Sequence, residues 1–208
     1  MHYLLFIYFL YYCMNSKLLL TFLFLLMMFS SPVLYSQNSE TSSNDLKFTL
    51  LSLGSGSTRI TYEKAFNPMN SAEFTLGIIG MGWDIMNGVN PQGLLCKLAY
   101  KWRLIPQKGA DSWLAGFYLK PELVLASYDY ETKSGEGGGL SRDVTHQYAL
   151  MAECGYQLVL NWFVFDIYTG LGPTVGTGNA DNYYHSFMRF PDDGPLAYTA
   201  GFRLGVAF

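Results

Sequence analysis

The C-terminal segment from Leu196 to Phe208 alternates between bulky apolar side chains and small or charged ones. Alternation with a period of two predicts a β-strand with two unlike faces. A soluble sheet packs its bulky face on a core and turns its polar face to water. In this segment the glycines share a face with the charged Arg203, so the charged face is the crowded one. That combination is typical of a small transmembrane β-barrel with a narrow polar lumen and a lipid-facing wall.

The same pattern recurs along the chain, with clusters of glycine, proline, asparagine and serine between the alternating segments. It predicts an all-β fold, an antiparallel up-and-down transmembrane β-barrel of about eight strands. We expect residues 37–45 to form a flexible lead-in and residues 46–208 to form the barrel. The expected strands cover residues 46–53, 58–66, 72–80, 93–104, 113–128, 145–160, 162–175 and 196–208.

The connections between these segments alternate in length, which predicts the orientation of the barrel. Outer-membrane barrels have short periplasmic turns and longer extracellular loops. The even-numbered connections are short and the odd-numbered ones long, except for the short first connection at 54–57, so we expect both ends of the barrel sequence on the periplasmic side. The short connections are 67–71, 105–112 and 161, and the long ones are 81–92, 129–144 and 176–195.

One choice of parity for each strand places charged residues and glycines on the same face and large apolar residues on the other. A barrel of about eight strands is filled by its own side chains, and charges buried there must pair with one another. Near balance of sign therefore predicts a plugged lumen held by ion pairs. Lys64 falls on the apolar face near a strand end, where its ammonium can reach lipid headgroups. The expected lumen charges are Arg59, Glu63, Glu73, Lys97, Lys101, Arg103, Lys120, Glu122, Glu153, Asp166 and Arg203.

Composition and the N-terminal segment agree with export to a membrane. The chain of 208 residues is 50% hydrophobic and only 14% charged, against about 25% charged residues in soluble domains. Past residue 36, no apolar run approaches the roughly 18 residues of a spanning helix. Lys17, the apolar run Leu18–Phe29 and the following small residues predict a signal peptide over residues 1–36. Translation from Met14 and an uncleaved anchor are alternatives, and the net charge of −3 argues against nucleic acid as a partner.

Two short segments resemble a known family. Ile60–Phe66, followed by an Asn-Pro turn, is similar to an early strand of small outer-membrane barrels of the OmpA and OmpX kind, especially the uncharacterised barrels of Bacteroidetes. Gly201–Phe208 resembles the C-terminal signal of such barrels. The resemblance implies a location in the bacterial outer membrane and recognition by the barrel assembly machinery. The residues of that signal are Phe202, Leu204, Val206 and Phe208.

Catalytic and metal chemistry find little support in the sequence. His146, Glu153 and the pair His185–Ser186 are the residues from which a lipid-modifying hydrolase would be built, but a nucleophile and its base must lie within hydrogen-bond reach. His146 has no serine two residues away, and Asp111–Ser112 falls in an expected periplasmic turn. Asp192–Asp193 supplies too few oxygens for calcium. We expect no catalytic residues, no metal and no cofactor.

The remaining cysteines and the last long loop complete the candidates. Cys96 and Cys154 fall on the apolar face of strands that are not neighbours, so we expect two free thiols. The loop 176–195 carries aromatic residues, which either bind an extracellular ligand or anchor the loop at the headgroups. The aromatic residues considered for binding are Tyr183, Tyr184, Phe187 and Phe190.

The pattern as a whole favours a non-enzymatic outer-membrane barrel with a charged, filled lumen, serving membrane structure or surface interaction with outer-membrane lipid around it. One alternative is a lipid-modifying enzyme of the deacylase or acyltransferase type on the same architecture. The other is a soluble periplasmic barrel like the lipocalins, which needs an apolar lumen and a wet exterior.

Overall fold

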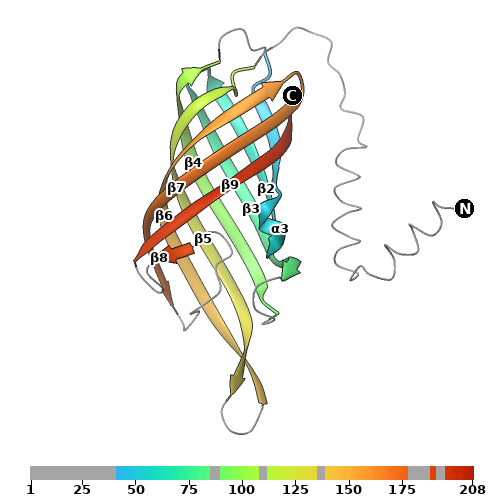
Figure 1. Ribbon diagram of the computed structural model, residues 1–208, viewed down its shortest axis with the longest axis vertical. Helices are drawn as coiled ribbons and strands as arrows, with labels where there is room; N and C mark the ends of the chain where they lie inside the picture. The colour runs from blue at the N-terminus through green and yellow to red at the C-terminus, as the bar shows by residue number, and fades with distance from the viewer. Residues whose placement is uncertain (1–40, 85–89, 108–111, 135–138, 178–187, 191–194) are drawn as a thin grey trace, which may run out of the picture.

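The computed structural model of the protein describes residues 41–84, 90–107, 112–134, 139–177, 188–190 and 195–208. Strands make up most of this part of the chain, and Figure 1 shows them tilted around a common axis. Eight of them are long. They are β1 (Asn44–Thr49), β2 (Ser55–Asn67), β3 (Asn70–Asp84), β4 (Gln92–Pro106), β5 (Gly116–Ser134), β6 (Gly139–Leu160), β7 (Phe163–Thr177) and β9 (Leu196–Ala207).

These strands close into an antiparallel barrel, which confirms the predicted fold class. Each strand pairs with the next from β1 to β7, β7 pairs with β9, and β9 pairs with β1. The closing register places Leu46 opposite Val206 and Phe48 opposite Leu204. Asn44 and Phe208 extend this pairing through two backbone hydrogen bonds of 3.1 and 2.9 Å. Closure pairs the first long strand with the last, as a barrel in hydrocarbon requires.

The start of the barrel differs from the expected strand at 46–53. β1 begins at Asn44, so Asn44 and Asp45 belong to the strand and not to the lead-in, and it ends at Thr49. A single helical turn, α3 (Leu51–Gly54), follows it. The hydroxyl of Ser52 donates to the Thr49 carbonyl at 2.6 Å. Serine side chains compete for backbone groups in this way and favour turns over strands.

The expected long loop at 129–144 is largely a β-ribbon. β5 continues to Ser134 and β6 begins at Gly139, and the two remain paired out to the Ser134–Gly139 register position. Their ends project beyond the other strands at the end of the barrel opposite to the C-terminus (Figure 1). Tyr130, Thr132 and Val144 lie in this stretch, and such aromatic and β-branched residues favour strands. Residues 135–138, which hold most of the glycine run, lie outside the described residues.

A short ninth strand extends the sheet near the same end. β8 (Met188–Phe190) pairs with β9 from Leu196 to Tyr198. This part of β9 lies beyond its pairing with β1, which covers only Arg203 to Ala207. β8 therefore covers an edge that β1 leaves free. The other residues of the expected loop at 178–187 and 191–194, and residues 85–89 of the loop at 81–92, lie outside the described residues.

The tight turns gather at the end of the barrel that holds the C-terminus (Figure 1). In the β2–β3 turn, the side-chain oxygen of Asn67 accepts hydrogen bonds from the backbone N–H groups of Met69 and Asn70, both at 2.9 Å. In the β6–β7 turn, Asn161 adopts φ 55°, a left-handed conformation that asparagine tolerates. In the described part of the chain, no helix has the length and apolar character needed to cross a membrane.

Candidate functional site in the barrel interior

The interior of the barrel holds a layer of buried charged side chains. All the positions expected there from sequence are buried, and so are two that the pattern did not assign, Asp45 and Lys47. Placing the start of the strand at residue 46 excluded Asp45. Lys47 alternates with Leu46 and Phe48, and this alternation is the pattern that predicts a lumen position for Lys47. The basic members are Lys47, Arg59, Lys97, Lys101, Arg103, Lys120 and Arg203, and the acidic ones are Asp45, Glu63, Glu73, Glu122, Glu153 and Asp166.

The end of this layer nearest the tight turns is organised around Glu63 of β2. The Glu63 carboxylate is fully buried and pairs with Lys47 from β1 and Arg103 from β4. It also accepts a hydrogen bond from Lys101 at 2.8 Å. The Ser71 hydroxyl donates to its other oxygen. One carboxylate therefore binds cations from β1, on one side of β2, and from β4, on the other side.

Glu73 of β3 occupies the centre of the layer. Its carboxylate lies 2.8 Å from both Lys47 and Lys101 and 2.6 Å from Lys120, and it reaches Arg203 of β9 at 3.3 Å. The four cations come from β1, β4, β5 and β9. Glu73 therefore joins opposite walls of the barrel. A buried carboxylate can remain charged when several cations and donors compensate its desolvation.

Two tyrosines and two glycines complete the central layer. Tyr118 donates a hydrogen bond of 2.7 Å to Asp166, and Asp166 pairs with Arg203 at 2.8 Å. The Arg203 guanidinium also lies 4.6 Å from the centre of the Tyr168 ring, within range of a cation–π interaction. A side chain at the neighbouring glycines would meet these rings. A Cβ added to Gly155 would lie 2.5 Å from the Tyr118 hydroxyl, and one added to Gly201 would lie 2.7 Å from that of Tyr168.

The other end of the charged layer is bound more loosely. Glu122 pairs with Lys97 at 2.6 Å and with Lys120 at 2.9 Å. Glu153 lies 3.1 Å from Lys120, yet neither of its oxygens accepts a hydrogen bond from the described residues. Arg59 donates to the hydroxyls of Ser57 and Ser55.

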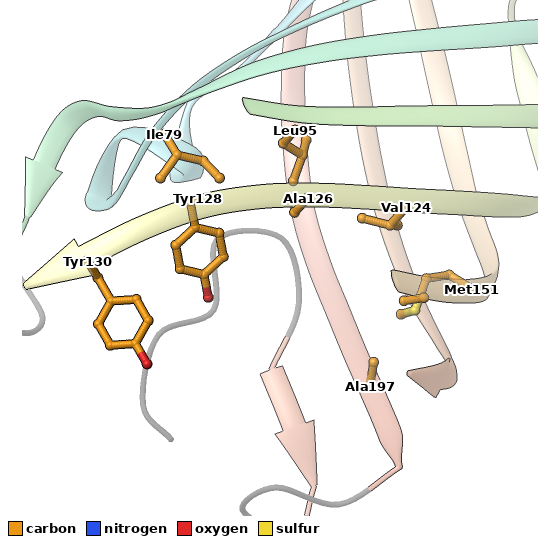
Figure 2. Packing of buried hydrophobic residues seen from close by; sticks show 9 residues of the cluster. Ile79, Leu95, Val124, Ala126, Tyr128, Tyr130, Met151 and Ala197 are labelled. Atoms are coloured by element: carbon orange, nitrogen blue, oxygen red, sulfur yellow. The ribbon is translucent and has the colours of Figure 1, made fainter. Parts of the chain in front are cut away.

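Apolar layers cover the charged layer at both ends. Toward the projecting ribbon, the lumen face of β5 carries Val124, Ala126, Tyr128 and Tyr130. Figure 2 shows both tyrosine rings on the same side of this strand. Ile79, Leu95, Ala149, Met151 and Ala197 complete this cluster, which lies inside the lumen at its ribbon end and is called the outer apolar cluster. Toward the tight turns, an inner cluster contains Ala65, Leu114, Ala115, Val159, Val164 and Ala207. Most strands therefore change along their inward face from apolar to charged or from charged to apolar.

The outer surface of the barrel has the opposite character. Large apolar side chains are exposed on every long strand except β1, with examples at Leu76 (56%), Leu94 (67%) and Ile167 (53%). Aromatic residues gather near the tight turns, where Phe66, Trp102, Trp162 and Phe208 are exposed. The signal residues Phe202, Leu204 and Val206 lie half-buried on this outer face of β9.

Among the described residues, the candidates for catalysis do not form a site. His146 and Glu153 lie on opposite faces of β6, since His146 is exposed and Glu153 faces the lumen. Ser112 donates to the backbone carbonyl of Ser42. His185, Ser186, Asp111, Asp192, Asp193, Tyr183, Tyr184 and Phe187 lie outside the described residues, and Phe190 is placed only as part of β8.

Cys96 and Cys154 are free thiols on β4 and β6, with β5 between them. Among the residues that the structure describes, no group of three histidine, cysteine, aspartate or glutamate side chains is placed to hold a metal ion.

Comparison with known proteins gives one similar structure. No protein-family model matches the chain, and no curated protein matches it. The crystal structure of the N-terminal β-barrel domain of Pseudomonas aeruginosa OprF is similar, with 11% sequence identity and a TM-score of 0.42. The similarity covers 81% of this chain and 98% of that one. The class of fold, a closed eight-stranded antiparallel barrel, follows from the strand pairing of this chain itself.

Proposed function

We propose that the protein is a non-enzymatic β-barrel of a bacterial outer membrane, exported by residues 1–36, with a closed lumen. The observation that carries this proposal is the inversion of its two faces. Thirteen charged side chains are buried inside, and the large apolar side chains exposed on the wall are leucine, isoleucine, valine, phenylalanine, tyrosine and tryptophan. Soluble monomers rarely expose continuous apolar surface beyond a few hundred Å². In a membrane the same surface is the lipid-facing band, with an aromatic girdle at the end that carries the tight turns.

The layered interior supports a structural role in preference to transport. Ions crossing the barrel would have to pass the outer apolar cluster, the ion-paired layer and the inner apolar cluster in turn. In the charged layer, carboxylates such as Glu63 and Glu73 are already bound by several cations each. Small barrels of this strand number are filled in this way. The protein then acts as a filled barrel that does not conduct ions and that presents its ribbon end outside the cell.

The lipocalin-like alternative conflicts with the placement of charge. A lipocalin binds its ligand in an apolar cavity and meets water on its outer wall. Here Lys101, Arg103 and Glu63 are fully buried in the interior, while Leu94 and Ile105 are each 67% exposed outside. The enzyme alternative has no assembled set of nucleophile and base among the described residues, because His146 and Glu153 lie on opposite faces of β6.

The projecting β5–β6 ribbon favours surface interaction as the second part of this role. Beyond Asp129 on β5, the residues pair only with β6, and before His146 on β6 they pair only with β5. The ribbon therefore extends beyond its neighbouring strands (Figure 1). Segments that project from a rigid scaffold are preferred places for binding. The described segments next to the expected loop at 176–195, the end of β7 and the start of β9, lie at the same end of the barrel, and we propose this loop as the second candidate contact.

Two measurements on the same preparation test the proposal. We expect the protein to fractionate with outer membranes and to run faster on a gel before heating than after heating, because folded barrels resist detergent. We also expect planar bilayers that contain the folded protein to show no stable conductance above background. Recovery in the soluble periplasm would overturn the membrane location, and steady single-channel currents would overturn the closed lumen.

A further inference from the structure

A groove of about 520 Å³ crosses the outer face of the barrel over β2 to β6. This volume lies within the range of roughly 300–1,000 Å³ found for ligand sites. The groove exists because two small side chains, Ala72 of β3 and Pro121 of β5, stand where neighbouring outward positions carry large ones. Tyr100 of β4 lies between these two strands, and Glu73 and Ala99, which have the inward parity, also line the groove, so backbone forms part of its floor.

One wall of the groove is a continuous row of large side chains. Tyr62, Phe74, Leu98, Leu123 and Leu150 are opposite one another in successive strand pairs from β2 to β6. Each is between 39% and 55% exposed, so the row stands out from the sheet. The wall and floor offer an apolar chain continuous contact along the barrel surface.

Among the described residues, the one cation that lines this groove is Lys64, at the end of the groove on β2. Lys64 is exposed and forms no ion pair with any residue that the structure describes. It lies three residues before Asn67 in the β2–β3 turn, or about 10 Å along the strand. Ala72, its partner on β3, is in turn opposite Tyr100 on β4. The ammonium therefore lies near the level of the aromatic girdle, where lipid headgroups meet acyl chains.

We propose that this groove binds one anionic phospholipid of the periplasmic leaflet. Its phosphate pairs with Lys64, and an acyl chain lies along the row from Phe74 toward Leu150. The inference rests on the sequence of polar and apolar groups along the groove. A cation lies at headgroup depth, and apolar surface continues from it toward the bilayer centre. This inference rests on the membrane location proposed above.

Native mass spectrometry can test the site with phosphatidylglycerol as the probe. The protein, produced from the full coding sequence and purified in a mild detergent, would be titrated with this lipid in three variants beside wild type. Lys64→Ala removes the cation, and Ala72→Leu fills the groove. Ala200→Leu adds the same side chain at an exposed outward position of β9, away from the groove, and serves as the matched control.

We expect wild type and Ala200→Leu to retain one lipid with equal affinity. Lys64→Ala should weaken retention about fivefold, the equivalent of about 1 kcal/mol for one basic residue at a membrane surface. Ala72→Leu should weaken retention of phosphatidylglycerol and of uncharged diacylglycerol alike, because it blocks the acyl chain. Heat-modifiable mobility of each variant shows that it is folded.

Three outcomes would overturn the site. Equal retention by all folded variants means that lipid binds the whole belt without preference. A dimer that Ala72→Leu dissociates means that a second copy of the chain occupies the groove. Equal loss in Ala200→Leu means that the effect is not local. Failure of wild type to enter membranes at all would refute the proposed location, which is a separate result from any of these.

Discussion

The two buried carboxylates Glu73 and Glu153 offer a controlled test of the ion-paired lumen. Both face the interior and both are at most 3% exposed, so glutamine at either position removes one charge from a similar environment. They differ in their cations. Glu73 lies within 3.3 Å of four cationic side chains. Among the residues that the structure describes, Glu153 pairs with Lys120 alone, at 3.1 Å.

Glu73→Gln should cost about 3–5 kcal/mol of unfolding free energy, the usual cost of breaking a buried ion pair from one side. The described lumen residues carry seven basic and six acidic side chains, so the substitution raises their net charge from +1 to +2. Glu153→Gln causes the same change in net charge. Its only cation, Lys120, still keeps Glu73 and Glu122. We expect a cost of about 1 kcal/mol or less for Glu153→Gln, close to one ordinary hydrogen bond.

The assay is reversible urea unfolding in phospholipid vesicles, followed by tryptophan fluorescence. Trp102, Trp113 and Trp162 are exposed on the outer surface, so their emission changes when the wall leaves lipid. The midpoint gives the free energy if the slope with urea is unchanged. Equal losses for the two variants would mean that net charge alone matters. A larger loss for Glu153→Gln would refute the arrangement of the network.

Three further predictions address the wall, the packing and the closing strand. Leu76→Arg, on the outer face of β3, should lower the free energy of unfolding in bilayers by about 2–4 kcal/mol, and an unchanged value in the same urea assay would place this face away from lipid. Gly201→Ala should cost about 1–3 kcal/mol through overpacking against the Tyr168 ring. Combining it with Tyr168→Ala should recover part of that loss, and strict additivity of the two changes would contradict the contact. Deleting Phe208 removes only its backbone pair with Asn44, so we expect refolding in detergent to be nearly normal while the outer-membrane yield falls through weaker recognition by the assembly machinery; equal yields would contradict that recognition.

The division of residues between lumen and wall could be predicted from sequence because it depends only on parity within each strand. Lys97, Lys101 and Arg103 alternate with Leu98, Tyr100 and Trp102, and no knowledge of neighbouring strands is needed to separate them. The inner apolar surface of β5 was equally visible in sequence, since Val124 and Ala126 continue the parity of Lys120 and Glu122. The apolar layers of the lumen follow from the same parity rule as the charged layer.

The ion pairs themselves could not be predicted, because they depend on how the strands are staggered around the barrel. Glu63 of β2 meets Lys101 and Arg103 of β4 across the intervening strand. Glu73 of β3 meets Arg203 of β9 across the lumen. Stagger is a property of the closed sheet, and alternation within one strand carries no information about it. The helical turn after Thr49 was missed for a related reason, since Leu51 and Leu53 continue a strand-like alternation while serine side chains bond the backbone.

The central claim is that the apolar face of the barrel lies in lipid and the charged face lies inside. Spin labels placed one at a time from Glu73 to Ile78 on β3, in protein reconstituted into vesicles, test it most directly through collision with dissolved oxygen and with a water-soluble nickel complex. High oxygen accessibility and low nickel accessibility are expected at Phe74, Leu76 and Ile78, which are exposed on the wall. Low accessibility to both reagents is expected at Glu73, Thr75 and Gly77, which face the filled interior. Alternation in nickel accessibility, with the wall positions open to water, would show a soluble barrel and would contradict the account.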